Sequence, residues 1–482
     1  MPEWLRQRAH LTPERLALVA AEGRLSYREL DRRVDAAADA LAGLGTGRGD
    51  RLALLLRNGR PFVVLVHAAA RLGCELVLLN TRLTRDELSW QVDDAGARLL
   101  VYDRPNGATA DALATSRPAL RGAGVEELLE SAERRDRAQP RDVGQIDLDS
   151  VQSIIYTSGT TGRPKGARLT YGNHWWSATG SALNLGLRED DRWLVCLPLF
   201  HVGGLAILLR SAIYGIAAVV HGSFDERAVN RAIDEERATI VSVVAAMLQR
   251  MLDARGEAPY PPWLRCVLLG GGPAPRALLE RCAERAVPVV QTYGLTESAS
   301  QVATLAPEDA LRKLGSAGKP LFPTELRVDA APGQVGEILA RGPTISPGYV
   351  NRPPRGQGAW LRTGDLGRLD DDGYLYVVDR RDDLIISGGE NVYPAEVEAA
   401  LLTHPEVAEA GVAGVADPTW GQVVFAAVVL RAGSRATAEE LRAHCRARLA
   451  DYKVPSLLRL VDALPRNAAG KLVRRRLVEP YE

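Results

Sequence analysis

Short apolar runs alternate with helical stripes along the N-terminal third of the chain. A capping box at Ser26 and Glu29 predicts the start of a helix whose apolar stripe begins at Leu30. The elements predicted after it are the strand 51–56, the helix 61–72, the strand 75–80, the helix 85–95 and the strand 98–103. Repeated strand–helix units favour a mostly parallel sheet.

Residues 104–149 interrupt this pattern and predict a surface excursion with one short helix near 125–134. Farther along, strands are predicted at 151–156, 193–197, 217–220, 239–244, 265–269, 288–292, 326–328, 336–341 and 373–378. The strands after about residue 325 are separated by Gly and Pro turns. For the final hundred residues the pattern predicts the order strand, helix, strand, strand, helix, strand. We therefore predict an α/β protein. Domain 1–381 holds βα-layered, mostly parallel sheets and a β-rich subdomain, and 382–482 is a small α+β domain.

Composition narrows the class of protein. Sixty basic and 60 acidic side chains cancel in the 482 residues, so nothing predicts bulk attraction to nucleic acid or acidic membrane. The N-terminus lacks the apolar core of a secretory signal, and Arg210 interrupts the apolar stretch 202–220, so no membrane span is expected. Five scattered cysteines without CxxC spacing disfavour zinc or a disulfide framework and fit the cytoplasm. The sequence leaves open whether the chain forms a homo-oligomer.

Lysine is rare in this chain. Among the 60 basic residues five are lysine, which leaves 55 arginines. A retained lysine marks a position where a compact ammonium serves better than a guanidinium, although chance explains any single one equally well. The lysines are Lys165, Lys313, Lys319, Lys453 and Lys471.

Residues 156–166 combine glycines, hydroxyl side chains and a lysine directly after an apolar run. Glycine allows close backbone approach, and hydroxyl and N–H groups donate to phosphate oxygens. The segment is not a Walker A loop, and the glycines at 270–272 are followed by Pro273, which excludes a dinucleotide fingerprint. The pattern predicts a phosphate-binding loop; the alternative is a flexible surface loop.

This segment resembles the phosphate loop of the adenylate-forming enzymes, which include acyl-CoA synthetases, peptide-synthetase adenylation domains and beetle luciferases. Further motifs of that family follow in order at 291–297, 363–365, 379–382, 388–394 and 465–471. Segments 78–83, 197–201, 268–275 and 313–322 are most similar to the o-succinylbenzoate–CoA ligases of menaquinone biosynthesis. The resemblance implies the adenylate-forming fold and a two-step reaction. An aromatic acid reacts with ATP to give an acyl-adenylate and pyrophosphate, and coenzyme A then displaces AMP.

The resemblance also implies roles for individual residues. Lys471 and Thr296 are expected to act in catalysis, and Glu297 to act with them and to hold Mg²⁺. Asp365 is expected to bind the ribose with help from Arg380; on local sequence alone these are a turn residue and a solvated charge. The other expected ATP-binding residues are Thr157, Ser158, Gly159, Thr160, Thr161, Gly162, Lys165, Gly270, Gly271, Gly272, Pro273, Gln291, Thr292, Tyr293 and Gly294.

On the acid side, the resemblance places Gly294 and His201 at the acyl pocket, His201 in a catalytic gating role, although a lone histidine is more often a satisfied core residue. Arg210 sits in an apolar segment and needs a partner. The implied substrate carries a second carboxylate on its succinyl arm, which we expect Arg210 to bind; the alternative is an internal ion pair. The segment with Gly388, Gly389 and Glu390 is expected to face coenzyme A, with Asp382 as the hinge of a rotating domain.

Three alternatives remain at this level. The acid could be another aryl or fatty acid, or the acceptor a carrier-protein thiol. A kinase or ATPase would release ADP instead of AMP and pyrophosphate. A non-catalytic nucleotide sensor would keep the loops but would not need Glu297, Asp365 and Lys471.

Overall fold

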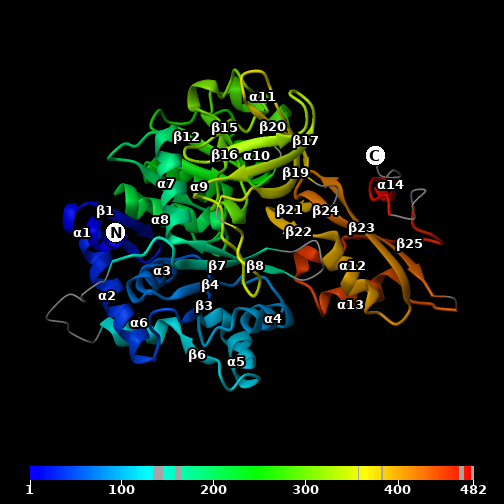
Figure 1. The fold of residues 1–482 in the computed structure, drawn as a ribbon, viewed down its shortest axis with the longest axis horizontal. Helices are drawn as coiled ribbons and strands as arrows, with labels where there is room; N and C mark the ends of the chain where they lie inside the picture. Colours follow the sequence, from blue (N-terminus) through cyan, green and yellow to red (C-terminus); the bar gives the residue numbers. More distant parts are fainter. Residues whose placement is uncertain are drawn as a thin grey trace.

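The computed structural model describes residues 1–133, 145–157, 164–272, 274, 276–356, 358–380, 384–431, 433–465 and 472–478. Figure 1 shows a large N-terminal part, coloured blue to yellow, beside a small C-terminal part in orange and red. We call these the N-terminal domain (described residues up to Arg380) and the C-terminal domain (Leu384–Val478). The predicted boundary at 381–382 lies outside the described residues.

One sheet of the N-terminal domain is built from the first predicted strand–helix units. Its order is β18 (Gly348–Tyr349), β8 (Lys165–Thr170), β7 (Val151–Thr157), β4 (Glu75–Leu78), β3 (Arg51–Leu55), β5 (Leu99–Tyr102) and β6 (Arg121–Gly124). Strands β7 to β6 are parallel, and β8 and β18 are antiparallel additions at the edge. The prediction of a surface excursion at 104–149 was partly wrong. Besides the expected helix, this segment holds α5 (Gly107–Thr115) and β6, whose Arg-Gly-Ala-Gly sequence carries no strand pattern.

A second, mostly parallel sheet lies beside the first. Its order is β15 (Lys319–Pro320), β14 (Ala303–Thr304), β13 (Val289–Tyr293), β12 (Cys266–Leu269), β11 (Ile240–Val243), β9 (Arg192–Val195), β10 (Ala217–Val220), β1 (Leu16–Ala20) and β2 (Gly23–Ser26). Antiparallel pairs occur at its two ends, and the pairs from β13 to β1 are parallel. The prediction of a mostly parallel α/β architecture is confirmed.

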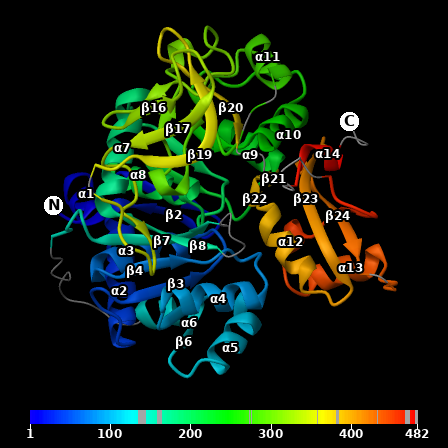
Figure 2. The same cartoon turned by 45° about the vertical axis from the view of Figure 1, so that its right-hand side comes forward.

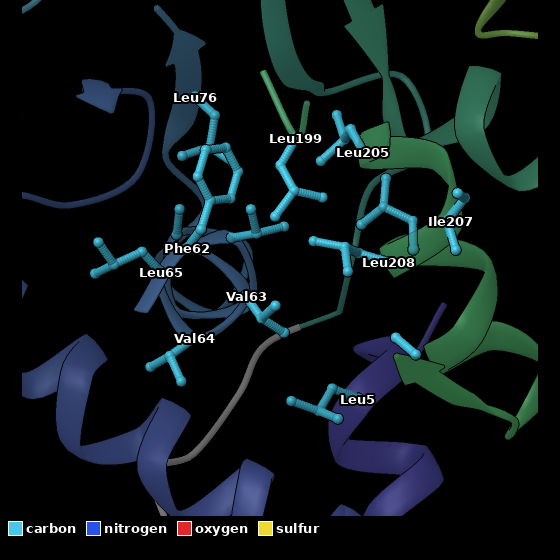
Figure 3. Packing of buried hydrophobic residues seen from close by; sticks show 14 of the residues in the cluster. Leu5, Phe62, Val63, Val64, Leu65, Leu76, Leu199, Leu205, Ile207 and Leu208 are labelled. Carbon is cyan, nitrogen blue, oxygen red and sulfur yellow. The ribbon is translucent and has the colours of Figure 1, made fainter. Parts of the chain in front are cut away.

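Helices cover both sheets, and many begin where the sequence predicts. Capping boxes start α2 at Ser26 and α4 at Thr84. Phe62 and Val63 of α3 pack with Leu205 and Leu208 of α8 in one buried cluster between the sheets (Figure 3). The helices are α1 (Trp4–Leu11), α2 (Tyr27–Gly43), α3 (Arg60–Leu72), α4 (Arg85–Ala95), α6 (Val125–Glu133), α7 (Tyr171–Leu185), α8 (Val202–Tyr214), α9 (Glu226–Glu235), α10 (Ala245–Arg255) and α11 (Arg276–Glu284), with short 3₁₀ turns η1 (Arg104–Asn106), η2 (Thr296–Ser298) and η3 (Pro307–Asp309).

The β-rich region is an antiparallel sheet of β16 (Glu325–Asp329), β17 (Gly336–Arg341), β19 (Leu361–Leu369) and β20 (Leu375–Arg380). The strands predicted at 326–328, 336–341 and 373–378 are present, whereas β19 was not predicted. The C-terminal sheet orders β22 (Glu390–Val392), β21 (Ile385–Ser387), β24 (Gly421–Leu430) and β23 (Val407–Asp417), with β25 (Leu457–Leu460) parallel to β24. Its helices are α12 (Pro394–Leu402), α13 (Ala438–Arg446), η4 (Asp451–Lys453) and α14 (Arg475–Val478). None of the described helices has the length and apolar character needed to cross a bilayer.

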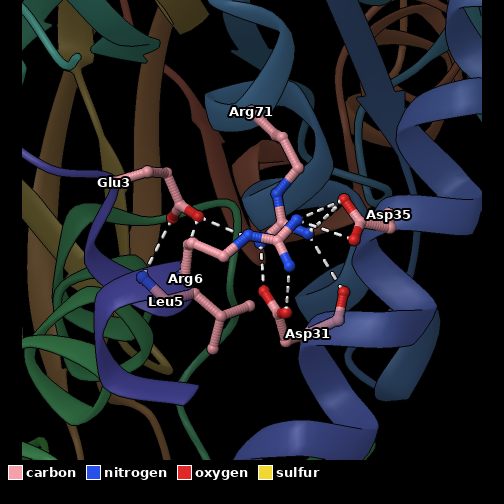
Figure 4. A network of polar contacts seen from close by, with 6 residues as sticks. All are labelled: Glu3, Leu5, Arg6, Asp31, Asp35 and Arg71. Atoms are coloured by element: carbon pink, nitrogen blue, oxygen red, sulfur yellow. Dashed lines mark hydrogen bonds and ion pairs between the residues drawn. The ribbon is translucent and has the colours of Figure 1, made fainter. Parts of the chain in front are cut away.

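A buried ion network ties the N-terminus to the first helices (Figure 4). The fully buried guanidinium of Arg71 on α3 donates to Glu3 at 3.0 Å, to Asp31 at 2.6 Å and to Asp35 at 2.8 Å. Arg6 pairs with Asp31 and Asp35 from the other side. Several buried carboxylates are therefore matched by guanidinium groups within one fixed corner of the fold.

Candidate active site

A cavity of about 1310 Å³ lies between the two domains. Most of the predicted site residues meet there, although they come from positions 157 to 390. The predicted residues that line it are Thr157, Lys165, His201, Arg210, Gly270, Gly271, Thr292, Gly294, Thr296, Glu297, Asp365, Gly388, Gly389 and Glu390. The structure therefore brings together residues whose order along the chain was known but whose proximity was not.

Other predicted residues are described elsewhere or not at all. Gln291 donates its amide to the carbonyl of Ser316 at 3.1 Å, and neither it nor Gly272 lines the cavity. Arg380 ends β20, where its backbone pairs with Asp365. The predicted residues that lie outside the described ones are Ser158, Gly159, Thr160, Thr161, Gly162, Pro273, Asp382 and Lys471.

The phosphate segment is framed by a hairpin. Thr157 ends β7 and faces Lys165, the first residue of β8, so Lys165 sits on a strand and not in a loop. Burial and the charge of Arg352 lower the pKa of the Lys165 ammonium, while Glu297 opposes this shift. The Thr157 hydroxyl donates to Glu297 Oε1 at 3.3 Å. A hydroxyl, an ammonium and a carboxylate therefore meet at one end of the cavity.

Glu297 on η2 offers one carboxylate oxygen to a cation. Its Oε1 also accepts a hydrogen bond from the Tyr349 hydroxyl at 2.8 Å, and Oε2 accepts none from the described residues. Burial and the Glu297 charge raise the pKa of Tyr349, which keeps this phenol a donor. An oxygen-only ligand on a fixed backbone fits Mg²⁺. The sequence does not predict Tyr349 as a site residue, because a lone tyrosine after Gly348 carries no chemical pattern.

Close packing within the protein requires glycine at two positions at the other end of the cavity. A Cβ on Gly270 would lie 2.8 Å from Thr292 Cγ2, and one on Gly294 would lie 1.6 Å from the carbonyl oxygen of Ser300. Asp365 is 4% exposed, and its Oδ2 accepts a hydrogen bond from Tyr293 at 2.7 Å. Tyr293 therefore supports Asp365 from behind and does not itself line the cavity.

Arg210 on α8 is a buried cation without a carboxylate partner among the described residues. It is 2% exposed and lines the cavity. Its Nη2 donates to Ser177 Oγ at 3.0 Å, and its Nε has no partner in the described part of the chain. Burial lowers the pKa of this guanidinium. The internal ion pair considered above is thus not found in the described part of the chain, and the guanidinium lines the cavity, within reach of an anion there.

Beside Arg210, His174 is held neutral. Burial and the Arg210 charge lower its pKa to about 3, and its Nε2 lies 3.1 Å from Ser153 Oγ. This histidine was missed because nothing in the sequence of α7 marks it as a neighbour of α8. This neutral histidine therefore adds no second positive charge beside Arg210.

The C-terminal domain closes the cavity with the segment Gly388–Tyr393. Glu390 Oε2 lies 3.1 Å from Nε2 of His201, the residue before α8. Although burial alone raises the pKa of Glu390, the charges of His201, Arg82 and Lys453 lower it below its ordinary value. A Cβ on Gly389 would lie 3.4 Å from Val244, the residue that one on Gly271 would approach to 3.0 Å. Two glycine turns, one from each domain, therefore meet at one valine.

The class of protein follows from this fold and cavity. Residues 5–350 match the AMP-binding enzyme family, and residues 396–471 match the AMP-binding enzyme C-terminal domain. The chain belongs to the AMP-binding enzyme family. It is similar to the 2-succinylbenzoate–CoA ligase of Geobacillus kaustophilus, with 52% identity over 99% of this chain and 97% of that protein.

Two solved structures of the Bacillus subtilis o-succinylbenzoate CoA synthetase sharpen the comparison. Both are 44% identical and cover 99% of this chain and 98% of theirs. The TM-score is 0.92 for a double mutant bound to the product analogue OSB-NCoA and 0.75 for the complex with the acyl-adenylate OSB-AMP. Because sequence identity and coverage are the same, the difference lies in shape. The overall shape of this chain is therefore more similar to that of the product-analogue complex.

Proposed function

We propose that this chain is an ATP-dependent 2-succinylbenzoate–CoA ligase of menaquinone biosynthesis. In the first half-reaction a carboxylate of the acid attacks the α-phosphorus of ATP, which forms the acyl-adenylate and releases pyrophosphate. In the second, the coenzyme A thiol attacks the acyl carbon, which forms the thioester and releases AMP. The observation that carries the choice of acid is Arg210, the buried cation without a carboxylate partner among the described residues.

The cavity supports the first half-reaction through charge and alignment. On this proposal Lys165 and the Thr157 hydroxyl, which line the cavity, bind the phosphate chain. Asp365, which accepts a hydrogen bond from Tyr293, accepts further hydrogen bonds from the ribose hydroxyls. Bound Mg²⁺, which Glu297 would hold, neutralises phosphate charge. We assign Lys471 the role of joining the acid carboxylate to an α-phosphate oxygen.

The second half-reaction uses the C-terminal domain. We propose that this domain turns about Asp382 and presents Lys471 in one orientation and the Gly388–Tyr393 segment in the other. The described arrangement places Gly388, Gly389 and Glu390 at the cavity. We also place the enzyme in the cytoplasm, since none of the five cysteines, all within the described residues, forms a disulfide and all are buried.

The test of the function is a panel of acids supplied with ATP, Mg²⁺ and coenzyme A and scored for AMP release. We expect o-succinylbenzoate to be preferred over benzoate and medium-chain fatty acids. Preference for a fatty acid, or transfer to a carrier protein only, would replace the assignment with one of its alternatives. Release of ADP, or no exchange of labelled pyrophosphate into ATP with any acid, would refute adenylation altogether.

Arg210 gives a sharper test of the substrate. Arg210→Ala should raise KM for o-succinylbenzoate about 30-fold or more, because the carboxylate that is not activated would lose a buried charged partner. KM for ATP should change less than about two-fold, because the effect is confined to the acid pocket. Arg210→Lys keeps the charge and serves as the matched variant, with a smaller rise expected from the lost second donor. An equal rise of KM for both substrates would show that Arg210 does not recognise the acid.

A further inference from the structure

The connection between β4 and α4 contacts the C-terminal domain through several polar groups. It includes the segment 78–83, of which Arg82 lines the cavity, and it continues to Glu87. Figure 2 shows α4 on the side of the N-terminal domain that faces the C-terminal domain. We call the residues that make these contacts the docking network: Asn80, Arg82, Thr84 and Glu87 from the N-terminal domain, and Glu390, Glu396, Arg448, Ala450, Tyr452 and Lys453 from the C-terminal domain.

Lys453 is the buried centre of the docking network. Its ammonium lies 2.6 Å from Glu87 Oε1 and 2.8 Å from Glu396 Oε1, and the three side chains are 4%, 9% and 7% exposed. Burial alone lowers the pKa of this ammonium, but Glu396 and Glu87 outweigh it and raise the pKa. Lys453 is one of only five lysines. Its position between two carboxylates suits the compact charge of an ammonium.

Glu87 performs two tasks with one carboxylate. Its Oε2 accepts hydrogen bonds from the backbone N–H and hydroxyl of Thr84, each at 2.8 Å, which completes the capping box of α4. The same oxygen accepts one from the backbone N–H of Ala450 at 3.1 Å, while Oε1 binds Lys453. Because the cap fixes this side chain within its own domain, the carboxylate is already in place when the C-terminal domain arrives.

The docking network also holds the segment that reaches the cavity. Arg82 donates to Glu390 Oε1 at 2.7 Å, and Asn80 donates to Glu390 Oε2 at 3.4 Å. Glu390 directly follows Gly388 and Gly389. Contacts at Glu87 and Lys453 therefore fix the same domain orientation that carries these glycines to Val244 and the cavity.

We infer that Glu87 and Lys453 are positioning residues for the thioester-forming half-reaction, and that they act by holding the C-terminal domain against α4 with no contact to the reacting atoms. The inference rests on the proposed function. Glu396 belongs to the same domain as Lys453 and moves with it, whereas Glu87 does not. Any rotation that carries the C-terminal domain off α4 separates Lys453 from Glu87 alone, so this pair acts in one orientation only.

Glu87→Gln tests the inference with little disturbance, because glutamine also completes a capping box. Acyl-adenylate formation is measured by pyrophosphate exchange without coenzyme A. Thioester formation is measured in a single turnover, by adding coenzyme A to the preformed enzyme–adenylate complex. We expect thioester formation to slow about ten-fold or more and adenylate formation to change less than about two-fold. Lys453→Arg keeps the charge and should recover more of the second rate than Lys453→Met.

Glu29→Gln is the matched control, because Glu29 completes the capping box of α2 with Ser26 and has no contact with the C-terminal domain. It should leave both half-reactions unchanged. Equal slowing of both half-reactions by Glu87→Gln would indicate a structural role, and an unchanged thioester rate would remove Glu87 from the reaction. Either result overturns the inference.

A readout without substrate separates this inference from the proposed function. Spin labels on Leu183→Cys and Leu402→Cys report the distance between the domains, since both positions are exposed and the five native cysteines are buried. Glu87→Gln should deplete the distance of the docked arrangement, and Glu29→Gln should not. An unchanged distribution overturns the inference even if the ligase activity is confirmed, and depletion supports it even if the acid proves to be another one.

Discussion

Two buried ion networks in this chain use the same chemistry for different ends. Arg71 is surrounded by Glu3, Asp31 and Asp35, all within one corner of the N-terminal domain (Figure 4). Lys453 lies between Glu87 of the N-terminal domain and Glu396 of its own domain. Both cations are almost completely buried. The first network joins parts that stay together, and the second joins parts that, on our proposal, must separate in every catalytic cycle.

The choice of cation matches this difference. A guanidinium presents five donors in a rigid fork and can bind several carboxylates at once, which suits a permanent junction. An ammonium presents three donors around a point charge, so it can exchange one partner for water while keeping the other. Only five of the 60 basic residues are lysine, and one of them, Lys453, makes the contact with Glu87 that on our proposal breaks. The predictions below test this distinction between a fixed and a releasable network.

The largest effect is expected from Arg71→Ala. This change leaves three buried carboxylates without their central cation, and breaking such a group costs about 3–5 kcal/mol of unfolding free energy. Urea unfolding followed by tryptophan fluorescence measures it, since buried Trp4 lies beside Glu3 in this corner. Arg276→Ala removes an exposed pair with Glu280 and should leave the midpoint unchanged. If the Arg71 variant unfolds with the wild type, the network does not stabilise the fold.

Different features of the sequence pointed to parts of these two ion networks. The capping box at Ser26 marked the start of the helix that carries Asp31 and Asp35, and the run 61–72 marked the helix that carries Arg71, but no local pattern joined them. Lysine scarcity singled out Lys453 without indicating a partner, because Glu87 lies 366 residues away in the chain. Composition can therefore single out a residue such as Lys453, but its partner is found only where the two domains meet.

The residues of the candidate site also differ in whether a local sequence pattern predicts them. Spacing and family resemblance marked Glu297, Asp365 and the glycine turns, because phosphate and nucleotide binding needs particular residue types close together in sequence. Tyr349, which donates to Glu297, and His174 beside Arg210 carry no such pattern. Strand β6 and the strand position of Lys165 were missed because sheet pairing and not residue preference decides them.

A double-mutant cycle between Glu87 and Lys453 should give a smaller but more specific effect. With Glu87→Gln, Lys453→Met and the double variant, the cycle cancels the contribution of Glu396 and leaves the pair alone. We expect a coupling energy of about 2 kcal/mol in the thioester step and close to zero in adenylate formation. The same coupling energy in both half-reactions would mean that the pair stays formed throughout the cycle, like the contacts of Arg71.

The smallest effect is expected from Arg82→Gln, at the edge of the docking network. Arg82 is 52% exposed, whereas its partner Glu390 is 4% exposed, so solvent screens this pair and its removal should slow the thioester step only about two-fold. Because mobile ions weaken exposed pairs most, the wild type and this variant should converge as potassium chloride is raised to about 0.5 M, where the Debye length is only a few ångströms. Glu87→Gln should stay slower than both at every salt concentration, since Lys453 and Glu87 are shielded from solvent. Single turnovers at saturating coenzyme A separate this effect from weaker substrate binding. If salt instead brought the Glu87 variant level with the wild type, burial would not distinguish the centre of the docking network from its edge.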